Sequence, residues 1–431
     1  SFEKSLSERT QNALKAEGDF MTGQNRSILS ALLDMGQALM QNGSEINRVE
    51  DTLCRMAHAF GCTNVNVFAI SNNIILTVSM PDGETETMTR RILGGNSTNY
   101  RALEELNELS RAFCAEPTGP SDLVNKIAEI KSAGVNRLKS YIGSALVGGS
   151  GALFFGGGVI DAAAATVIGL CMCLIQRHTM KILKNNIVFN FLISFIIGVL
   201  TALISFLIPA LSIGHVFTGD LMILITGLAI TVSILDVLLG DTVSGLMRAM
   251  ESVLSAAVLA VGYALAMQLL GTENSTLDIG GQTVIVSIAA SLFMSLGFAL
   301  IYQLSMRHLI VTSVTGMSGW ITFLICSHIG MQDFYAAMLA SMTVAVVSEV
   351  AARIHKAPVV FFRTPAVMPL APGKLLFGIM ESLNLHKWSV LGTYLISTLE
   401  WTLGIAVGLC AVNLFVKVVS GLMDSRRSDH F

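Results

Sequence analysis

Residues 186–207 read NIVFNFLISFIIGVLTALISFL, an apolar run without a charged side chain. It is one of about ten such stretches between Tyr141 and Lys417, each close to the roughly 20 residues that an α-helix needs to cross a bilayer. Hydrophobic residues make up 52% of the chain and charged residues 13%, and the mean hydropathy is +0.65, which excludes an ordinary soluble protein of 431 residues. The sequence therefore predicts a polytopic α-helical membrane protein.

Basic residues are distributed unevenly among the connecting segments. Lysine and arginine near the ends of spans stay on the cytoplasmic side, so alternate basic loops predict the orientation. Both termini are expected in the cytoplasm, in a multi-pass protein of the cell membrane. The predicted cytoplasmic segments carry Lys126, Lys131, Arg137, Lys139, Arg177, Lys181, Lys184, Arg248, Arg307, Arg353, Lys356, Arg363, Lys417, Arg426 and Arg427. The other loops contain no lysine or arginine except Lys387; they lie at 160–162, 212–219, 271–281, 327–333 and 383–388.

Residues 1–136 differ from the rest of the chain and predict a cytoplasmic α+β domain. Apolar residues recur with a helical period over 28–39 and 46–57, with Gly43 ending the first helix and Ser44 able to cap the second. The period then changes to two, which is typical of strands. The domain is expected to contain a three-stranded meander over 65–69, 74–80 and 84–92, followed by amphipathic helices over 100–113 and 121–131.

The membrane part divides near Gly280 into portions 137–279 and 280–431, each with about five spans. Because five is odd, the second portion must run with the opposite orientation. Two equal portions of opposed topology are the layout of inverted-repeat secondary transporters, although a channel or a structural membrane protein is the alternative. A weak internal match, Thr218–Met222 against Pro372–Leu376, supports the repeat. Pro372 and Gly373 cannot continue an ordinary helix, so they free backbone groups that are tolerated at membrane depth where a cavity is lined.

Ionisable residues within spans are costly and mark candidate sites for substrate or protons. Asp236 lies within the fourth span of the first portion. Asp241 follows it by five residues, about 140° around a helix, so the two face different ways unless Gly240 breaks the helix. Asp241 and Arg248 share a helical face. For these two, a cytoplasmic turn with exposed charges is the alternative interpretation.

Three further acidic residues are candidates for the same role. Asp161 follows a run of three glycines at an outer turn, where a solvated loop position is the alternative. Glu349 precedes Arg353 by one helical turn, as in a surface ion pair. Glu381 falls within the ninth predicted span and is harder to explain as a surface residue.

Other features favour packing over chemistry. Ser144, Gly148, Ala152 and Gly156 form a stripe of small residues that predicts close helix packing. The seven cysteines lack a metal-type CxxC pair, and no P-loop or hydrolase motif is present. No metal or cofactor is expected, and a net charge of −3 gives no reason to expect nucleic acid as a partner.

Four short stretches carry a further signal. They are LLDMGQALMQNGSEINRVEDT at 32–52, NYRALEELNELSR at 99–111, DVLLGDTVSGLMR at 236–248 and PLAPG at 369–373. In this order and spacing, the chain resembles the threonine/serine exporter (ThrE) family over nearly its whole length. One departure is that Phe217-Thr218-Gly219 stands where the family often has a Pro-Gly, which argues against a strictly matched pair of broken helices.

The resemblance implies proton-driven export of threonine and serine, with no enzymatic activity. Relatives that encode the second portion as a separate protein imply a dicarboxylate such as succinate as the alternative substrate. A membrane-embedded hydrolase and a passive channel are alternatives of other classes, and a homo-oligomer is left open. The mostly acidic buried charges lean toward an amino acid, because its ammonium needs a carboxylate.

The resulting hypothesis is alternating access around a midplane site between the two portions. Asp236 would be the carboxylate that binds a proton or the substrate ammonium, and freed amides near Gly219 and Gly373 would take the substrate carboxylate. The domain over 1–136 would act as a cytoplasmic gate or sensor.

Overall fold

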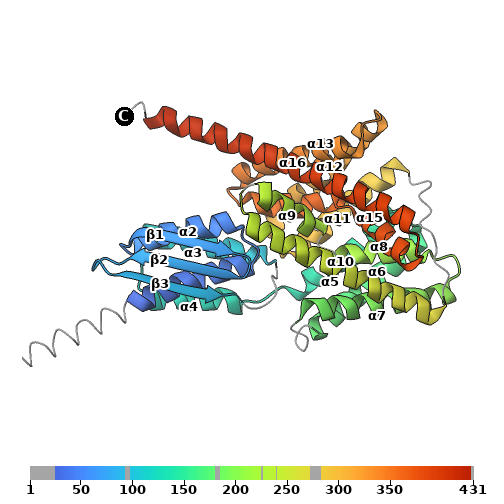
Figure 1. Cartoon of the computed structure of the whole chain (residues 1–431), viewed down its shortest axis with the longest axis horizontal. Helices are drawn as coiled ribbons and strands as arrows, with labels where there is room; N and C mark the ends of the chain where they lie inside the picture. The colour runs from blue at the N-terminus through green and yellow to red at the C-terminus, as the bar shows by residue number, and fades with distance from the viewer. Residues whose placement is uncertain are drawn as a thin grey trace, which may run out of the picture. The chain divides into compact units, whose positions relative to one another are not determined.

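The computed structural model describes residues 25–92, 98–179, 185–224, 227–238, 240–271 and 283–428, apart from the side chains of 227–229 and 420–428 (Figure 1). It divides into two compact units, residues 1–135 and 136–431. Some of the predicted features lie outside the described residues: Lys181, Lys184, the side chains of Arg426 and Arg427, and the predicted boundary at 279/280.

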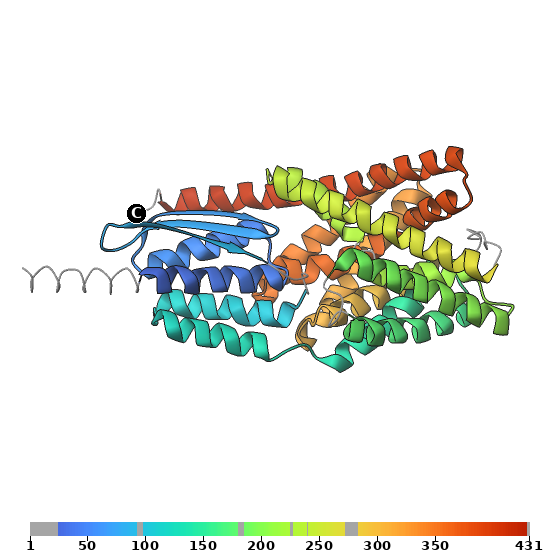
Figure 2. The same ribbon diagram turned by 60° about the horizontal axis from the view of Figure 1, so that its bottom comes forward.

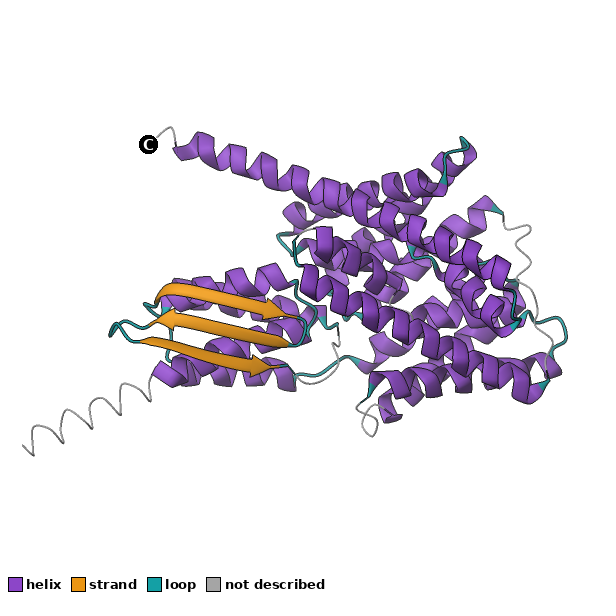
Figure 3. Ribbon diagram, viewed as in Figure 1, coloured by secondary structure: helices purple, strands orange, loops and turns teal. Residues whose placement is uncertain are grey.

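The first unit has an α+β fold with one antiparallel sheet of order β1-β2-β3. Its helices lie on one side of that sheet (Figure 2). After a helix over 25–41, the elements are α2 (Ile46–Ala59), β1 (Thr63–Ile70), β2 (Asn73–Ser79), β3 (Thr85–Arg91), α3 (Tyr100–Ala115) and α4 (Pro120–Ser132). The predicted meander and both following helices are confirmed (Figure 3).

Buried and partly exposed side chains alternate along β2, because the helices cover one face of the sheet. Ile74, Leu76 and Val78 are buried, while the residues between them are only partly covered. Gly43 ends the first described helix with φ of +92°, a left-handed conformation that favours glycine. The predicted cap by Ser44 is wrong, because Glu45 occupies the N-cap position and no side chain caps α2.

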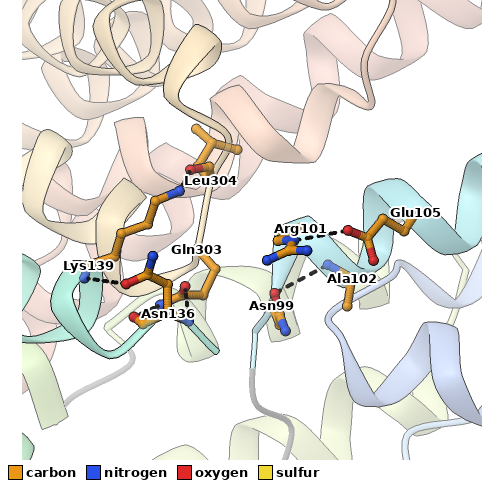
Figure 4. Close-up of polar contacts among 8 residues, drawn as sticks. All are labelled: Asn99, Arg101, Ala102, Glu105, Asn136, Lys139, Gln303 and Leu304. Atoms are coloured by element: carbon orange, nitrogen blue, oxygen red, sulfur yellow. Dashed lines mark hydrogen bonds and ion pairs between the residues drawn. The ribbon is translucent and has the colours of Figure 1, made fainter. Parts of the chain in front are cut away.

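A helix cap and two ion pairs stabilise the first unit. Asn99 caps α3 by accepting the N–H of Ala102 at 3.3 Å, and Arg101 pairs with Glu105 one turn later (Figure 4). Arg90 on β3 lies 2.7 Å from the Asp34 carboxylate on the first described helix, which joins sheet to helix.

The second unit is helical throughout its described residues. Its elements are α5 (Arg137–Phe154), α6 (Val159–Thr179), α7 (Asn186–Leu207), α8 (Ile213–Leu224), α9 (Gly227–Leu238), α10 (Thr242–Leu270), α11 (Val284–Ile301), α12 (Met306–His328), α13 (Asp333–His355), α14 (Val359–Val367), the 3₁₀ turn η1 (Met368–Leu370), α15 (Gly373–Asn384) and α16 (Trp388–Ser428). Seven of these helices are long and apolar enough to cross a membrane, and the bent pair formed by 359–370 and 373–384 can act as an eighth span.

Helix α5 occupies an interior position, in contact with α6, α8 and α11. Its small residues create close approaches. A Cβ on Gly148 would lie 2.6 Å from the Ala165 carbonyl oxygen of α6, and one on Gly219 of α8 would lie 2.5 Å from the Ala152 nitrogen. A Cβ on Gly169 of α6 would lie 2.7 Å from the Ser144 carbonyl oxygen. The predicted stripe is therefore confirmed as a packing surface at Ser144, Gly148 and Ala152, whereas Gly156 lies beyond the end of α5. A helix surrounded by protein does not need the large apolar side chains that lipid contact favours, which explains its weaker apolar signal.

Candidate functional site

The first span of each predicted portion packs against the other in antiparallel fashion. Gln303, at the end of α11, accepts the Asn136 N–H at 2.8 Å and donates to the Asn136 carbonyl at 3.2 Å, at the start of α5. Lys139 Nζ donates to the Leu304 carbonyl at 2.8 Å (Figure 4). The start of α5 thus lies beside the end of α11, so the two helices run in opposite directions.

A bent segment follows α13 in the second predicted portion. The axes of 359–370 and 373–384 differ by 48°. Pro369 lies in η1, and Pro372 precedes the first residue of α15, whose N-terminus has no side-chain cap. Trp401 on α16 donates its indole N–H to the Leu370 carbonyl at 2.6 Å, which satisfies one backbone group at the bend. The predicted interruption at Pro372 and Gly373 is confirmed.

This bend lies against the first predicted portion. A Cβ on Gly373 would collide with Met222 Sδ of α8 and would lie 2.9 Å from Phe155 Cζ after α5. Further along, Phe217 of α8 and Phe377 of α15 have ring centroids 6.1 Å apart. Since early residues of α8 meet later residues of α15, these two helices are also antiparallel, and the uncapped amides of α15 start beside Met222.

Gly219 does not supply free amides of this kind. It lies inside α8, which begins at Ile213, and its backbone is helical. A Cβ on Gly219 would lie 2.5 Å from the Ala152 nitrogen and 2.7 Å from the Gly148 carbonyl. The glycine therefore permits close contact between α5 and α8, and the expected broken backbone at this position is corrected to helix packing.

Asp236 and Arg248 form an ion pair, whereas the sequence placed Arg248 on one helical face with Asp241. Arg248 Nη1 lies 3.1 Å from Asp236 Oδ2, with the two side chains 26% and 18% exposed. Gly240, with φ of +102°, ends the helical path after α9 and lets the chain turn back into α10. Asp241 stands at the N-cap of α10 without a capping side-chain bond. The sequence predicts that Asp236 lies well inside a span. In the structure, Asp236 is only two residues from the end of α9.

Asp161 is a buried structural carboxylate. It is 5% exposed and accepts the backbone N–H groups of Gly158 at 2.9 Å and Ser212 at 2.8 Å. His215 Nδ1 lies 3.9 Å from its Oδ2. These contacts join the start of α6 to the segment before α8, so the interpretation as a solvated loop residue is wrong.

The two remaining acidic candidates have different environments. Arg353 Nη2 is 4.0 Å from Glu349 Oε2 and is 66% exposed, which fits a weak surface pair. Glu381 on α15 is half-buried, and its Oε1 has no hydrogen-bond partner among the described residues. The structure places neither residue with Asp236 in one cluster.

Sequence reasoning missed Asp220 as a functional candidate. This aspartate is completely buried in α8, and neither of its oxygens has a hydrogen-bond partner in the described parts of the chain. The available signal was a carboxylate within an apolar run. The sequence predicts an outer loop over 212–219, which puts Asp220 at the membrane surface, whereas α8 begins at Ile213 and encloses the aspartate.

Among the described residues, no group of three or more His, Cys, Asp or Glu side chains is placed to hold a metal ion. The second unit contains three polar features within its apolar helices: an uncapped helix start on α15, a buried carboxylate on α8 and an ion pair between α9 and α10.

Comparison with known families covers most of the chain. Residues 30–270 match the family model described as "Putative threonine/serine exporter", and residues 287–415 match the model described as "Threonine/Serine exporter, ThrE". Comparisons with curated proteins and with solved structures gave no match. The first family match ends at the last residue of α10, and the second begins within α11.

Proposed function

This chain belongs to the threonine/serine exporter family, and on that basis we propose that it is a secondary active exporter of threonine and serine. Transport proceeds by alternating access and is driven by proton entry. The observation that carries the proposal is the meeting of the uncapped start of α15 with Met222 of α8, because it joins the two predicted portions at an interrupted helix.

The proposed topology has ten spans in two inverted sets of five. Helix α5 and the pair α8–α9 add two spans to the eight that apolar length supports. The antiparallel pairing of α5 with α11 supports opposite orientations for the two sets, since each helix opens its own set. With basic residues on the cytoplasmic side, both termini and the unit over 1–135 lie in the cytoplasm of a cell-membrane protein.

The substrate site is proposed near the first turn of α15. Backbone N–H groups at a helix start favour an anion. The Gly373 N–H donates to the Ala371 carbonyl at 2.8 Å, so the next two amides, those of Lys374 and Leu375, would bind the substrate carboxylate. Asp236 lies with Arg248 at the proposed cytoplasmic end of α9, where it would attract the substrate ammonium at the entrance, at a distance from the site on α15. Asp241 sits at the turn between these two residues and would add negative charge to that entrance. Glu381, half-buried on α15, is a second carboxylate available to the ammonium.

The test also distinguishes a different substrate, a dicarboxylate, and two different classes of protein, a passive channel and a membrane-embedded hydrolase. A dicarboxylate such as succinate needs two positive sites, whereas the candidate carboxylates here favour a zwitterion. A passive channel and a membrane-embedded hydrolase would not accumulate substrate against its gradient. In this proposal, Asp161 and Glu349 stabilise the fold and do not bind substrate. Asp161 lies at the start of α6, and Glu349 lies near the end of α13.

The test uses the full chain reconstituted in proteoliposomes. Labelled threonine, serine and succinate are compared for counterflow and for uphill movement driven by a pH gradient, with protein-free vesicles and a protonophore as controls. We expect threonine and serine to accumulate only with the gradient intact. Accumulation of succinate alone would reject the amino-acid assignment, and downhill flux without counterflow or accumulation would reject a carrier.

A further inference from the structure

The completely buried carboxylate of Asp220 has no role in the substrate site described above. It lies on α8, which contacts α5, α6, α7 and α15 (Figure 1). A Cβ on Gly148 of α5 would lie 2.5 Å from Asp220 Oδ1, and one on Gly169 of α6 would lie 3.3 Å from the same oxygen. Two glycines on neighbouring helices therefore make the space that the carboxylate occupies.

The surroundings of Asp220 do not stabilise a charge. Both of its oxygens lack a hydrogen-bond partner among the described residues, and its exposed fraction is zero. An ionised carboxylate without a partner loses its hydration and gains no interaction in return, so in this conformation the neutral acid is strongly favoured. A neutral acid holds a proton at one of its two oxygens.

Titratable groups on α8 and on the helices packed against it do not pair with Asp220. Helix α7 carries none. His215, five residues earlier on α8, lies nearest to Asp161. The other such groups are Arg137, Lys139 and Tyr141 on α5, Asp161, Cys171, Cys173, Arg177 and His178 on α6, and Lys374 and Glu381 on α15.

The tight packing also decides the size of the ligand. A single added methyl group at Gly148 would already overlap with the Asp220 oxygen. An amino-acid ammonium carries a substituted carbon behind it and is larger than a methyl group. No substituted carbon fits between Gly148 and Asp220 Oδ1 in the present conformation, whereas a proton bonded to the carboxylate needs no added space.

We propose that Asp220 is the group that carries the exchanged proton, an inference that rests on the proposed function. When the site faces outward, an external proton bonds to a carboxylate oxygen of Asp220 and removes its charge. The neutral side chain can then be enclosed by α5 and α6, as in this structure. When the site faces the cytoplasm, the O–H bond breaks and the proton leaves to water, and the carrier returns outward with the substrate bound at its separate site near α15.

The first experiment compares Asp220→Asn with the matched control Asp333→Asn, at an exposed residue that begins α13. Asparagine imitates the neutral acid but cannot release a proton. For Asp220→Asn, threonine exchange should stay within about two-fold of wild type, the range of a change that removes no essential contact. Export driven by a pH gradient should fall to the level of protein-free vesicles. Asp333→Asn should keep both activities.

Retained gradient-driven export by Asp220→Asn would overturn the proposal, as would coupling of wild type to a sodium gradient without a pH gradient. Absence of threonine exchange in wild type would instead reject the proposed function.

A second measurement does not depend on transport or on the folding of a variant. Dicyclohexylcarbodiimide reacts with protonated carboxyl groups in apolar surroundings, and mass spectrometry of the wild-type protein locates the adduct. We expect an adduct on Asp220 that decreases as the pH of the reaction rises. An unmodified Asp220, or an adduct whose yield is independent of pH, would contradict the proposal.

Discussion

Replacing Gly219 by alanine tests the close packing of α5 against α8. The added Cβ would lie 2.5 Å from the Ala152 nitrogen, 2.7 Å from the Gly148 carbonyl oxygen and 3.1 Å from Ala152 Cα. All three neighbours are backbone atoms, so no rotation of a side chain can relieve the overlap. The helices must separate instead.

The expected loss of stability follows from two opposing effects. Restoring an ordinary contact distance requires a shift of about 1 Å in a close-packed interior, and such overpacking costs about 1–3 kcal/mol. The backbone neighbours place this change near the upper end of that range. Alanine favours the helix by about 1 kcal/mol relative to glycine, which offsets part of the cost of overpacking. The free energy of unfolding should therefore fall by about 2 kcal/mol, which lowers the Tm of a unit of about 300 residues by about 3 °C.

The assay is thermal unfolding of the purified full chain in detergent, followed by circular dichroism. Gly392→Ala on α16 is the matched control, because nothing lies within 4 Å of its added Cβ and its φ is ordinary. This control should leave Tm unchanged or raise it slightly. An unchanged or higher Tm for Gly219→Ala would refute the assignment of a tight contact between α5 and α8.

Two further changes address the bend and the first unit. Trp401→Phe removes the indole donor to the buried Leu370 carbonyl and should lower the free energy of unfolding in detergent by about 1–3 kcal/mol. The control Trp388→Phe changes a 65% exposed residue and should leave the stability unchanged. Equal Tm values for the two variants would contradict the role of this bond. Asn25 donates to the Asp82 carboxylate at 2.7 Å, which together with the Glu84 N–H lowers the pKa of Asp82. A lowered folded-state pKa adds stability above the usual pKa of aspartate, and this stability is lost as the pH falls through the lowered value. Asn25→Ala should therefore flatten the acid-side decrease of Tm below about pH 5, and an unchanged profile would show that the bond is not formed.

Much of the architecture could be predicted from local patterns. The meander over β1–β3, the helices α3 and α4, and the interruption at Pro372 follow from periodicity and from the backbone of proline, which each segment carries within itself. The candidate site was harder to predict. Gly240 was recognised as a break that could redirect Asp236, but pairing with Arg248 depends on how sharply the chain turns back.

The sequence by itself determined that the chain is a membrane protein with alternating basic loops, because hydropathy and charge act on each span separately. Only the tertiary structure decided which polar residues are enclosed. Asp161 and Asp220 are both aspartates near glycines, yet one accepts two backbone N–H groups and the other accepts none. That difference arises from helices α5, α6 and α8 meeting across more than fifty residues of chain, and no pattern within one segment contains it.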